Sequence, residues 1–140
     1  MATKKAVTAK ELALEAGLTW SPALEALWAL PAGATFEEYE RLEPSAAIER
    51  RASLLKLMAS KAFRAKIKDN ERFDDGGRVR AVHYDGGWIP FAEDGGGCLL
   101  CLDTNPGPKG KANQIVQWEL RGGGAFVRAP SLKAFLKDLG

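Results

Sequence analysis

The stretch from Glu93 to Asp103, EDGGGCLLCLD, constrains the fold of this chain more than any other part of its sequence. Its three glycines, Gly95, Gly96 and Gly97, allow positive φ without steric cost, so the backbone can reverse sharply there. The residues that follow, Cys98 to Leu102, are all apolar, which is typical of a strand buried on both faces. The sequence therefore predicts a tight turn followed by the central strand of a sheet.

Other segments in the second half of the chain also have strand-like patterns. Short runs such as Asp85-Gly86-Gly87 separate them and predict tight reversals, so neighbouring strands are expected to be antiparallel. In the segment that begins at Gln114, Val116, Trp118 and Leu120 are expected to point inward. With the central strand, the sheet has about five strands, and the other four are expected at Val79 to Tyr84, Trp88 to Phe91, Gln114 to Leu120 and Ala125 to Arg128.

Helical patterns occupy the first half of the chain and its end. Thr8 with Glu11, and Thr35 with Glu38, have the spacing of capping boxes, which predicts a helix after Thr8 and a short helical turn after Thr35. Apolar residues at helical spacing predict that the longest helix packs its Ile48, Leu55 and Met58 side on the sheet. The expected class is α+β, with helices from Thr8 to about Ala16, from Ser21 to before Pro31, from about Ser45 to Lys66 and from Ser131 to Leu139.

The length of 140 residues fits one domain, with residues 1–7 expected to be a flexible tail. No apolar run has the length of a signal peptide or a membrane span, so we expect a cytoplasmic protein without membrane contact. We expect it to be a monomer or a weak homodimer.

Charge is unevenly distributed, although the formal net charge is only +2. Residues 45–68 contain seven Lys or Arg and one Glu, which gives this segment a charge of +6. Such a segment could face a polyanion or an acidic protein, or it could simply be a solvated helix face. The chain has no recognised nucleic-acid motif and no pattern of exposed aromatic residues interleaved with the basic ones, which argues against nucleic acid as the partner.

No set of residues completes a catalytic or metal site. Cys98 and Cys101 have C-x-x-C spacing, but on a strand they point to opposite faces, and His83 is the only histidine available to help hold a metal. We therefore interpret both cysteines as buried free thiols and His83 as a structural residue of a strand. The Gly107 to Ala112 loop lacks the glycine and the hydroxyl residue of a phosphate loop. We predict no enzyme activity, no metal and no cofactor.

The segment from Trp88 to Val116 resembles the SUKH superfamily, specifically the Smi/Knr-like family of fungal cell-wall regulators and bacterial toxin-immunity proteins. The family pattern is approximately W-hydrophobic-P-hydrophobic-A-x-D-G-G-G-D-x-L-C-L-D, then x-D-P-x-P, a Gly/basic loop and G-Q-V. The segment departs from the pattern where Cys98 and Asn105 replace acids and Asn113 replaces a glycine. It matches the pattern at Trp88, Ile89, Pro90, Phe91, Ala92, Asp94, Gly95, Gly96, Gly97, Leu100, Cys101, Leu102, Asp103, Pro106, Pro108, Gln114 and Ile115.

The resemblance implies a non-enzymatic binding protein, either an immunity protein for a cognate toxin or a regulatory module for an endogenous partner. Asp103 precedes a turn-rich loop, where an aspartate commonly accepts backbone hydrogen bonds, although partner recognition stays open for both Asp94 and Asp103. The sequence leaves open whether Trp88 lies in the core or at an interface. The candidate contact surface is one edge of the sheet and the Thr104 to Asn113 loop, with the residues Trp88, Glu93, Asp94, Asp103, Asn105, Lys109 and Lys111.

Overall fold

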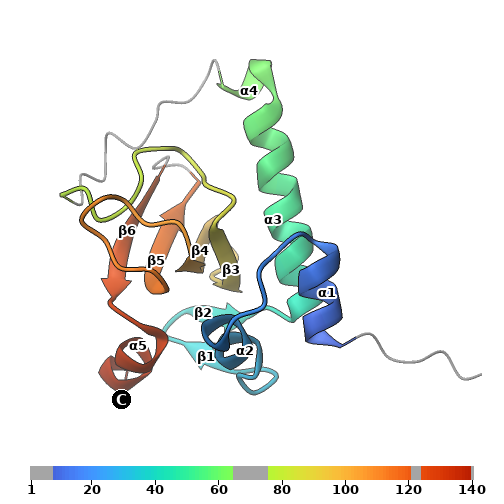
Figure 1. The fold of residues 1–140 in the computed structure, drawn as a ribbon, viewed down its shortest axis with the longest axis vertical. Coiled ribbons are helices and arrows are strands. Elements are labelled where there is room, and N and C mark those ends of the chain that lie inside the picture. Colours follow the sequence, from blue (N-terminus) through green and yellow to red (C-terminus); the bar gives the residue numbers. More distant parts are fainter. Residues whose placement is uncertain (1–7, 65–75, 121–123, 140) are drawn as a thin grey trace, which may run out of the picture.

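A six-stranded antiparallel sheet forms the centre of the protein in residues 8–64, 76–120 and 124–139, the part of the chain that this computed structural model describes (Figure 1). The strand order follows the chain, so each strand pairs with the next. One more strand is present than the sequence predicts, and the α+β class is confirmed. The strands are β1 (Thr35–Phe36), β2 (Tyr39–Arg41), β3 (Trp88–Glu93), β4 (Cys98–Asp103), β5 (Gln114–Glu119) and β6 (Gly124–Ala129).

The apolar strand β4 lies inside the sheet, between β3 and β5, as the sequence predicts. Its side chains alternate between two separate cores. Leu100 and Leu102 belong to the first core, and Leu99 and Cys101 belong to the second. Because both faces of β4 are covered, an uninterrupted apolar run is the pattern that this strand requires.

Five helices cover the sheet in the described residues. Hydroxyl side chains cap three of them, since Thr8, Ser21 and Ser131 each accept a hydrogen bond from a backbone N–H three residues further on. This confirms the predicted starts of the first two helices and of the last. The helices are α1 (Ala9–Glu15), α2 (Pro22–Trp28), α3 (Pro44–Ala59), α4 (Lys61–Arg64) and α5 (Leu132–Asp138).

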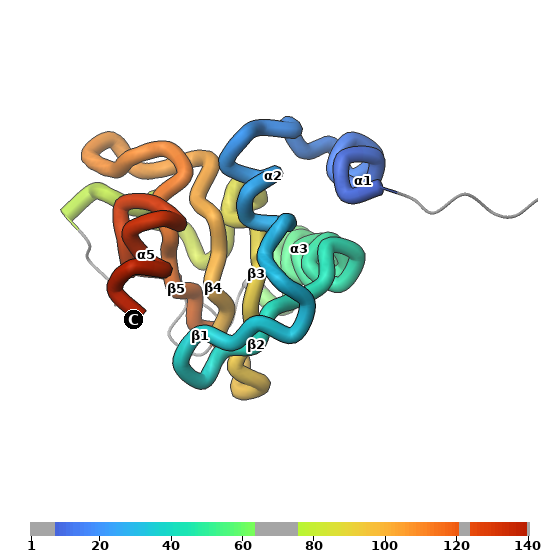
Figure 2. The backbone as a smooth tube through the Cα atoms, turned by 90° about the horizontal axis from the view of Figure 1, so that it is seen from below, coloured from blue at the N-terminus to red at the C-terminus, as the bar shows by residue number. Residues whose placement is uncertain are grey.

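The helices are divided between the two cores. Residues of α1, α2 and α5 pack with the β1–β2 hairpin in the first core, and α3 supplies Ala47 and Leu54 to the second. Both views place α3 beside β3 (Figures 1 and 2). This arrangement sets α3 and the loop between α1 and α2 next to the β3–β4 hairpin.

The predicted helical turn at Thr35 to Glu38 is wrong, because the chain forms the β1–β2 hairpin there. Glu37 occupies its tip with a φ of 58°. Phe36 is buried against Phe91 and Phe135, at ring-centroid distances of 5.9 and 6.0 Å. Burial of this aromatic side chain outweighs a local capping preference.

The predicted strand at Val79 to Tyr84 is also wrong. Val79, His83 and Tyr84 are buried, but the segment forms no ladder with a neighbouring strand among the described residues. Its burial does not follow the period of two that a strand would give. The segment contributes side chains to the second core as an irregular connection.

The long helix ends at Ala59, with Ser60 as its C-cap, which is earlier than the predicted end near Lys66. Residues 65–66 lie outside the described residues. The Ser60 hydroxyl accepts a hydrogen bond from Phe63 N, which starts α4 as a new helix. The fully buried positions of α3 are Ala47 and Leu54, each one residue before the predicted Ile48 and Leu55, which are half-buried.

Of two smaller predictions, one is wrong and one concerns residues that the structure does not describe. Leu120 lies beyond the end of β5 and is 40% exposed, so it does not point inward as predicted. The expected flexible tail, residues 1–7, lies outside the described residues. Among the described helices, none has the length and apolar content that crossing a membrane requires.

Candidate functional site

The predicted contact residues divide between the two ends of the β3–β4 hairpin. In the antiparallel register, Trp88 pairs with Asp103 at one end, and Glu93 pairs with Leu99 near the other. Trp88 and Glu93 are five positions apart along β3, or about 17 Å at the usual rise per residue. The single edge expected from the sequence is therefore two separate surfaces.

At the turn end, Asp94 holds the three glycines in place. Its Oδ1 atom accepts hydrogen bonds from Gly96 N at 2.7 Å and Cys98 N at 3.1 Å. Gly95 and Gly97 have φ values of +80° and +100°, which confirms the prediction of positive φ in this turn. Partial burial raises the pKa of Asp94, but these hydrogen bonds outweigh it and leave the pKa below its usual value.

A cavity of about 410 Å³ lies beside this turn, and we call it the turn groove. Its wall includes Leu57 and Leu120, two of the large apolar side chains that are exposed among the described residues. Arg50 of α3 forms an ion pair with Glu93 at its rim. Glu93, a predicted contact residue, is thus already held by a cation of the same chain.

At the base end of the hairpin, Asp103 is fully buried and organises the loop that follows it. Its Oδ1 atom accepts a hydrogen bond from Asn105 N at 2.9 Å, and its Oδ2 atom accepts one from Gln114 Nε2 at 2.9 Å. This confirms the predicted turn-forming role. Burial raises the pKa of Asp103 above its usual value, and the two hydrogen bonds offset this only in part.

Trp88 and Asp103 have no exposed surface in this structure, so neither side chain is available for direct contact with a partner. Trp88 belongs to the second core, where its ring lies against Tyr84 at a centroid distance of 5.7 Å. Tyr84 also donates a hydrogen bond from its hydroxyl to the Trp88 carbonyl. The core interpretation of Trp88 is the one that the structure supports.

The Thr104 to Asn113 loop is fixed against the connection that precedes β3. Gly107 N donates to Arg78 O at 3.0 Å, and Lys109 N donates to Gly77 O at 2.9 Å. A Cβ atom on Gly107 would lie only 2.3 Å from Gly77 O, so the close approach of the two backbones requires glycine there. Gly107 therefore serves the packing of the two backbones.

The side chains of this loop remain available at the surface. Asn105, Lys109 and Lys111, three predicted contact residues, are all exposed. The Asn105 side chain donates a hydrogen bond to Asp85 at 3.3 Å. Asn113 has a φ of 68°, a conformation that asparagine tolerates better than most residues, which explains how it can replace a glycine there.

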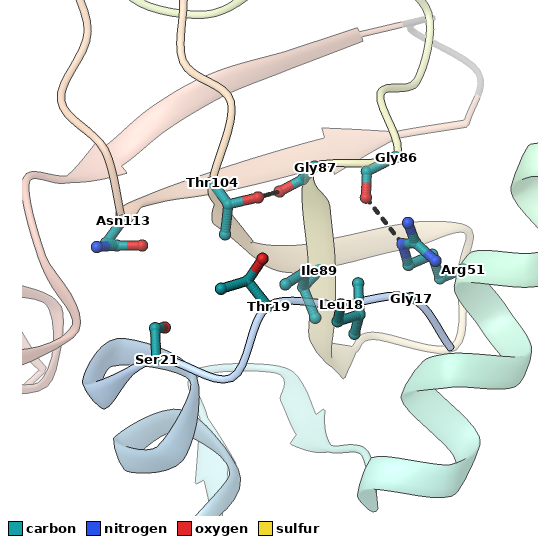
Figure 3. A pocket seen from close by; sticks show the side chains of 10 residues that line it. All are labelled: Gly17, Leu18, Thr19, Ser21, Arg51, Gly86, Gly87, Ile89, Thr104 and Asn113. Atoms are coloured by element: carbon teal, nitrogen blue, oxygen red, sulfur yellow. Dashed lines mark hydrogen bonds between the residues drawn. The ribbon is translucent and has the colours of Figure 1, made fainter. Parts of the chain in front are cut away.

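A second cavity, of about 450 Å³, opens beside this loop, and we call it the base groove (Figure 3). Arg51 and Asn113 lie at opposite ends of it, with Thr19 and Thr104 between them. The sequence did not indicate Thr19 or Arg51 as site residues. The basic character of the long helix was the one signal for Arg51. The remaining lining residues are Gly17, Leu18, Ser21, Gly86, Gly87 and Ile89.

The cysteines are free, and they lie on opposite faces of the sheet as predicted. Burial and the nearby carboxylates of Asp94 and Glu119 raise the pKa of Cys98 to about 11. Burial, with a smaller contribution from Asp103, holds the pKa of Cys101 well above its usual value. Both thiols are therefore weak nucleophiles near neutral pH.

His83 is buried between the rings of Phe63 and Trp118, at centroid distances of 5.6 and 5.9 Å. Its carbonyl accepts a hydrogen bond from Trp118 Nε1 at 2.7 Å. The residue is structural, as predicted, although it does not lie in a strand. Within residues 8–64, 76–120 and 124–139, no three His, Cys, Asp or Glu side chains come together as metal ligands.

The model of the SMI1 / KNR4 family (SUKH-1) matches residues 1–138, so this chain belongs to that family. Domains of this family are generally non-catalytic immunity or regulatory modules that interact with other proteins. A search of curated proteins finds no match.

Proposed function

We propose that this protein is a cytoplasmic immunity protein that neutralises a cognate bacterial toxin, often a nuclease in this family, by direct binding. The observation that carries the proposal is family membership over residues 1–138. Binding alone is sufficient for this function, because a bound protein that covers an active site or a substrate groove stops the toxin without any chemistry of its own.

The contact surface that we favour is the Thr104 to Asn113 loop together with the base groove. The loop is held by backbone hydrogen bonds and by Asp103, so the backbone that carries its exposed side chains is already ordered before a partner arrives. Such preorganisation lowers the entropic cost of binding. Lys109 and Lys111 make the loop basic, which favours an acidic patch on the toxin.

Co-expression with the toxin domain encoded beside this gene tests the proposal. We expect the chain to restore growth of cells that produce the toxin domain and to co-purify with it as a complex. No rescue and no complex at micromolar concentration would reject immunity and leave a regulatory module for an endogenous partner as the better account.

A charge reversal on the loop tests the contact surface. The double variant Lys109→Glu/Lys111→Glu should weaken toxin binding by about tenfold, mainly through slower association, because exposed charges act on the encounter rate. Its control is Lys133→Glu/Lys137→Glu on α5, which makes the same charge change at two exposed positions. Equal binding by the two double variants, measured by biolayer interferometry, would move the contact surface away from the loop.

A further inference from the structure

Arg51 stands out among the basic residues of α3 because of where its charge lies. Its side chain is half-buried, and its Nε atom donates a hydrogen bond to Gly86 O at 2.8 Å. No carboxylate of the described residues forms an ion pair with it, whereas the adjacent Arg50 is paired with Glu93. The two neighbouring arginines therefore line different grooves, Arg50 with an acidic partner and Arg51 without one among the described residues.

The bond to Gly86 uses one N–H group and fixes the guanidinium at one end of the base groove (Figure 3). Arginine has five N–H donors in a planar fork, and two of them can bind both oxygens of a carboxylate. A charge withdrawn from water is costly unless it is paired, so an arginine held in this way favours an anionic ligand.

The rest of the groove indicates which anion it would take. Leu18 and Ile89 form an apolar part of the lining, and both are buried. Thr19 adds a hydroxyl in the middle of the groove, and Asn113 adds an amide at the end away from Arg51. Among the described residues of the lining, Arg51 is the one that carries a charge, whereas a nucleic-acid backbone is normally held by several cations. The combination suits an aspartate or glutamate side chain of a protein.

We propose that the base groove receives an acidic side chain of the protein partner, with Arg51 as its charge partner and Asn113 as a polar contact at the far end. This inference rests on the proposed function, because the partner is the toxin domain. In this arrangement the immunity protein supplies the cation and the toxin domain supplies the carboxylate.

Two variants test the groove against the toxin domain. Arg51→Gln should raise the Kd by at least tenfold, because it leaves a buried carboxylate of the partner unpaired. Arg50→Gln is the matched control, because it makes the same change at the preceding residue, which lines the turn groove. It should change the Kd by less than about threefold. Thermal unfolding of each variant shows whether the loss of the Gly86 contact affects the fold itself.

Asn113→Gly provides a test that does not disturb the backbone. Glycine keeps the positive φ of this position and removes only the side chain, so the Kd should rise about fivefold, as for one lost hydrogen bond. If both Arg51→Gln and Asn113→Gly remain folded and bind the toxin domain with unchanged affinity, the groove inference is overturned while the proposed function stands.

A titration with a small probe separates the two proposals. N-acetyl-L-glutamate α-amide, added to the ¹⁵N-labelled full chain, should shift the amide resonances of Gly86, Gly87 and Thr104 in the parent and in Arg50→Gln, but not in Arg51→Gln. If these resonances shift but no complex with the toxin domain forms, immunity is rejected and the carboxylate site is supported. An absence of shifts, or stronger binding of inorganic phosphate at the same amides, would overturn the carboxylate site.

Discussion

At the scale of single residues, two aspartates that the sequence could not assign have different environments. Asp94 is partly exposed and accepts two backbone hydrogen bonds at the triglycine turn. Asp103 is fully buried and connects the end of β4 to the loop that follows. Their pKa values shift in opposite directions, downward for Asp94 and upward for Asp103. Each carboxylate therefore makes its own contribution to the pH dependence of stability.

The lowered pKa of Asp94 means that its ionised form stabilises the folded state. This contribution is present above the pKa of the unfolded chain and is lost as the pH falls through the lower folded-state value. We expect Asp94→Asn to lower the free energy of unfolding by about 1 kcal/mol at pH 7. Urea unfolding at pH 7 and in strong acid should show the difference shrinking in acid, and a constant difference would contradict this role.

The raised pKa of Asp103 has the opposite effect on the pH dependence of stability. Ionisation of Asp103 opposes folding above its folded-state pKa, and this cost is relieved as the pH falls through that value. Its hydrogen bonds to Asn105 and Gln114 nevertheless order the loop. Ionisation of Asp103 thus lowers stability at neutral pH to some degree, while the residue positions the surface that we assign to the partner.

At the scale of elements, the β3–β4 hairpin sets the geometry of both grooves. Its turn end supplies Glu93, Gly95 and Gly97 to the turn groove, and its base end supplies Ile89 and Thr104 to the base groove. The turn must close with Gly95 and Gly97 at positive φ for β3 and β4 to pair in this register. The turn conformation is therefore a requirement of the sheet.

Gly97→Val should lower the free energy of unfolding by about 2 kcal/mol, because a β-branched residue is strained at a φ of +100°. Gly96→Ala is the matched control. The φ of Gly96 is not positive, and an added Cβ would meet the Asp94 carboxylate only at ordinary contact distances of 3.6 Å or more. Chemical denaturation measures both variants, and equal stability of the two would show that the turn does not depend on glycine conformation.

The elements also show what the sequence can and cannot predict. The bounds of β4 and the turn role of Asp103 follow from residues adjacent in the chain, and both predictions are confirmed. The β1–β2 hairpin depends on Phe36 packing against Phe91 and Phe135, which lie far along the chain, so a local capping pattern gave the wrong element. Contacts between residues far apart in the sequence determine that this segment is a hairpin.

At the scale of the whole molecule, the predicted site is only partly the one that the structure presents. The base groove combines Thr19 from the segment before α2, Arg51 from α3, and Thr104 and Asn113 from the two ends of one loop. No spacing in the sequence brings these residues together, so only the fold reveals the groove. The pairing register of β3 and β4 likewise separated contact residues that are close in sequence.

The proposed function requires that this protein acts by stoichiometric binding. A direct measurement is the catalytic activity of the cognate toxin domain that we propose, titrated with the purified full chain. We predict a linear loss of activity that is complete at one equivalent, without any change in the chain itself. Toxin activity that is unchanged at a large molar excess would contradict the account.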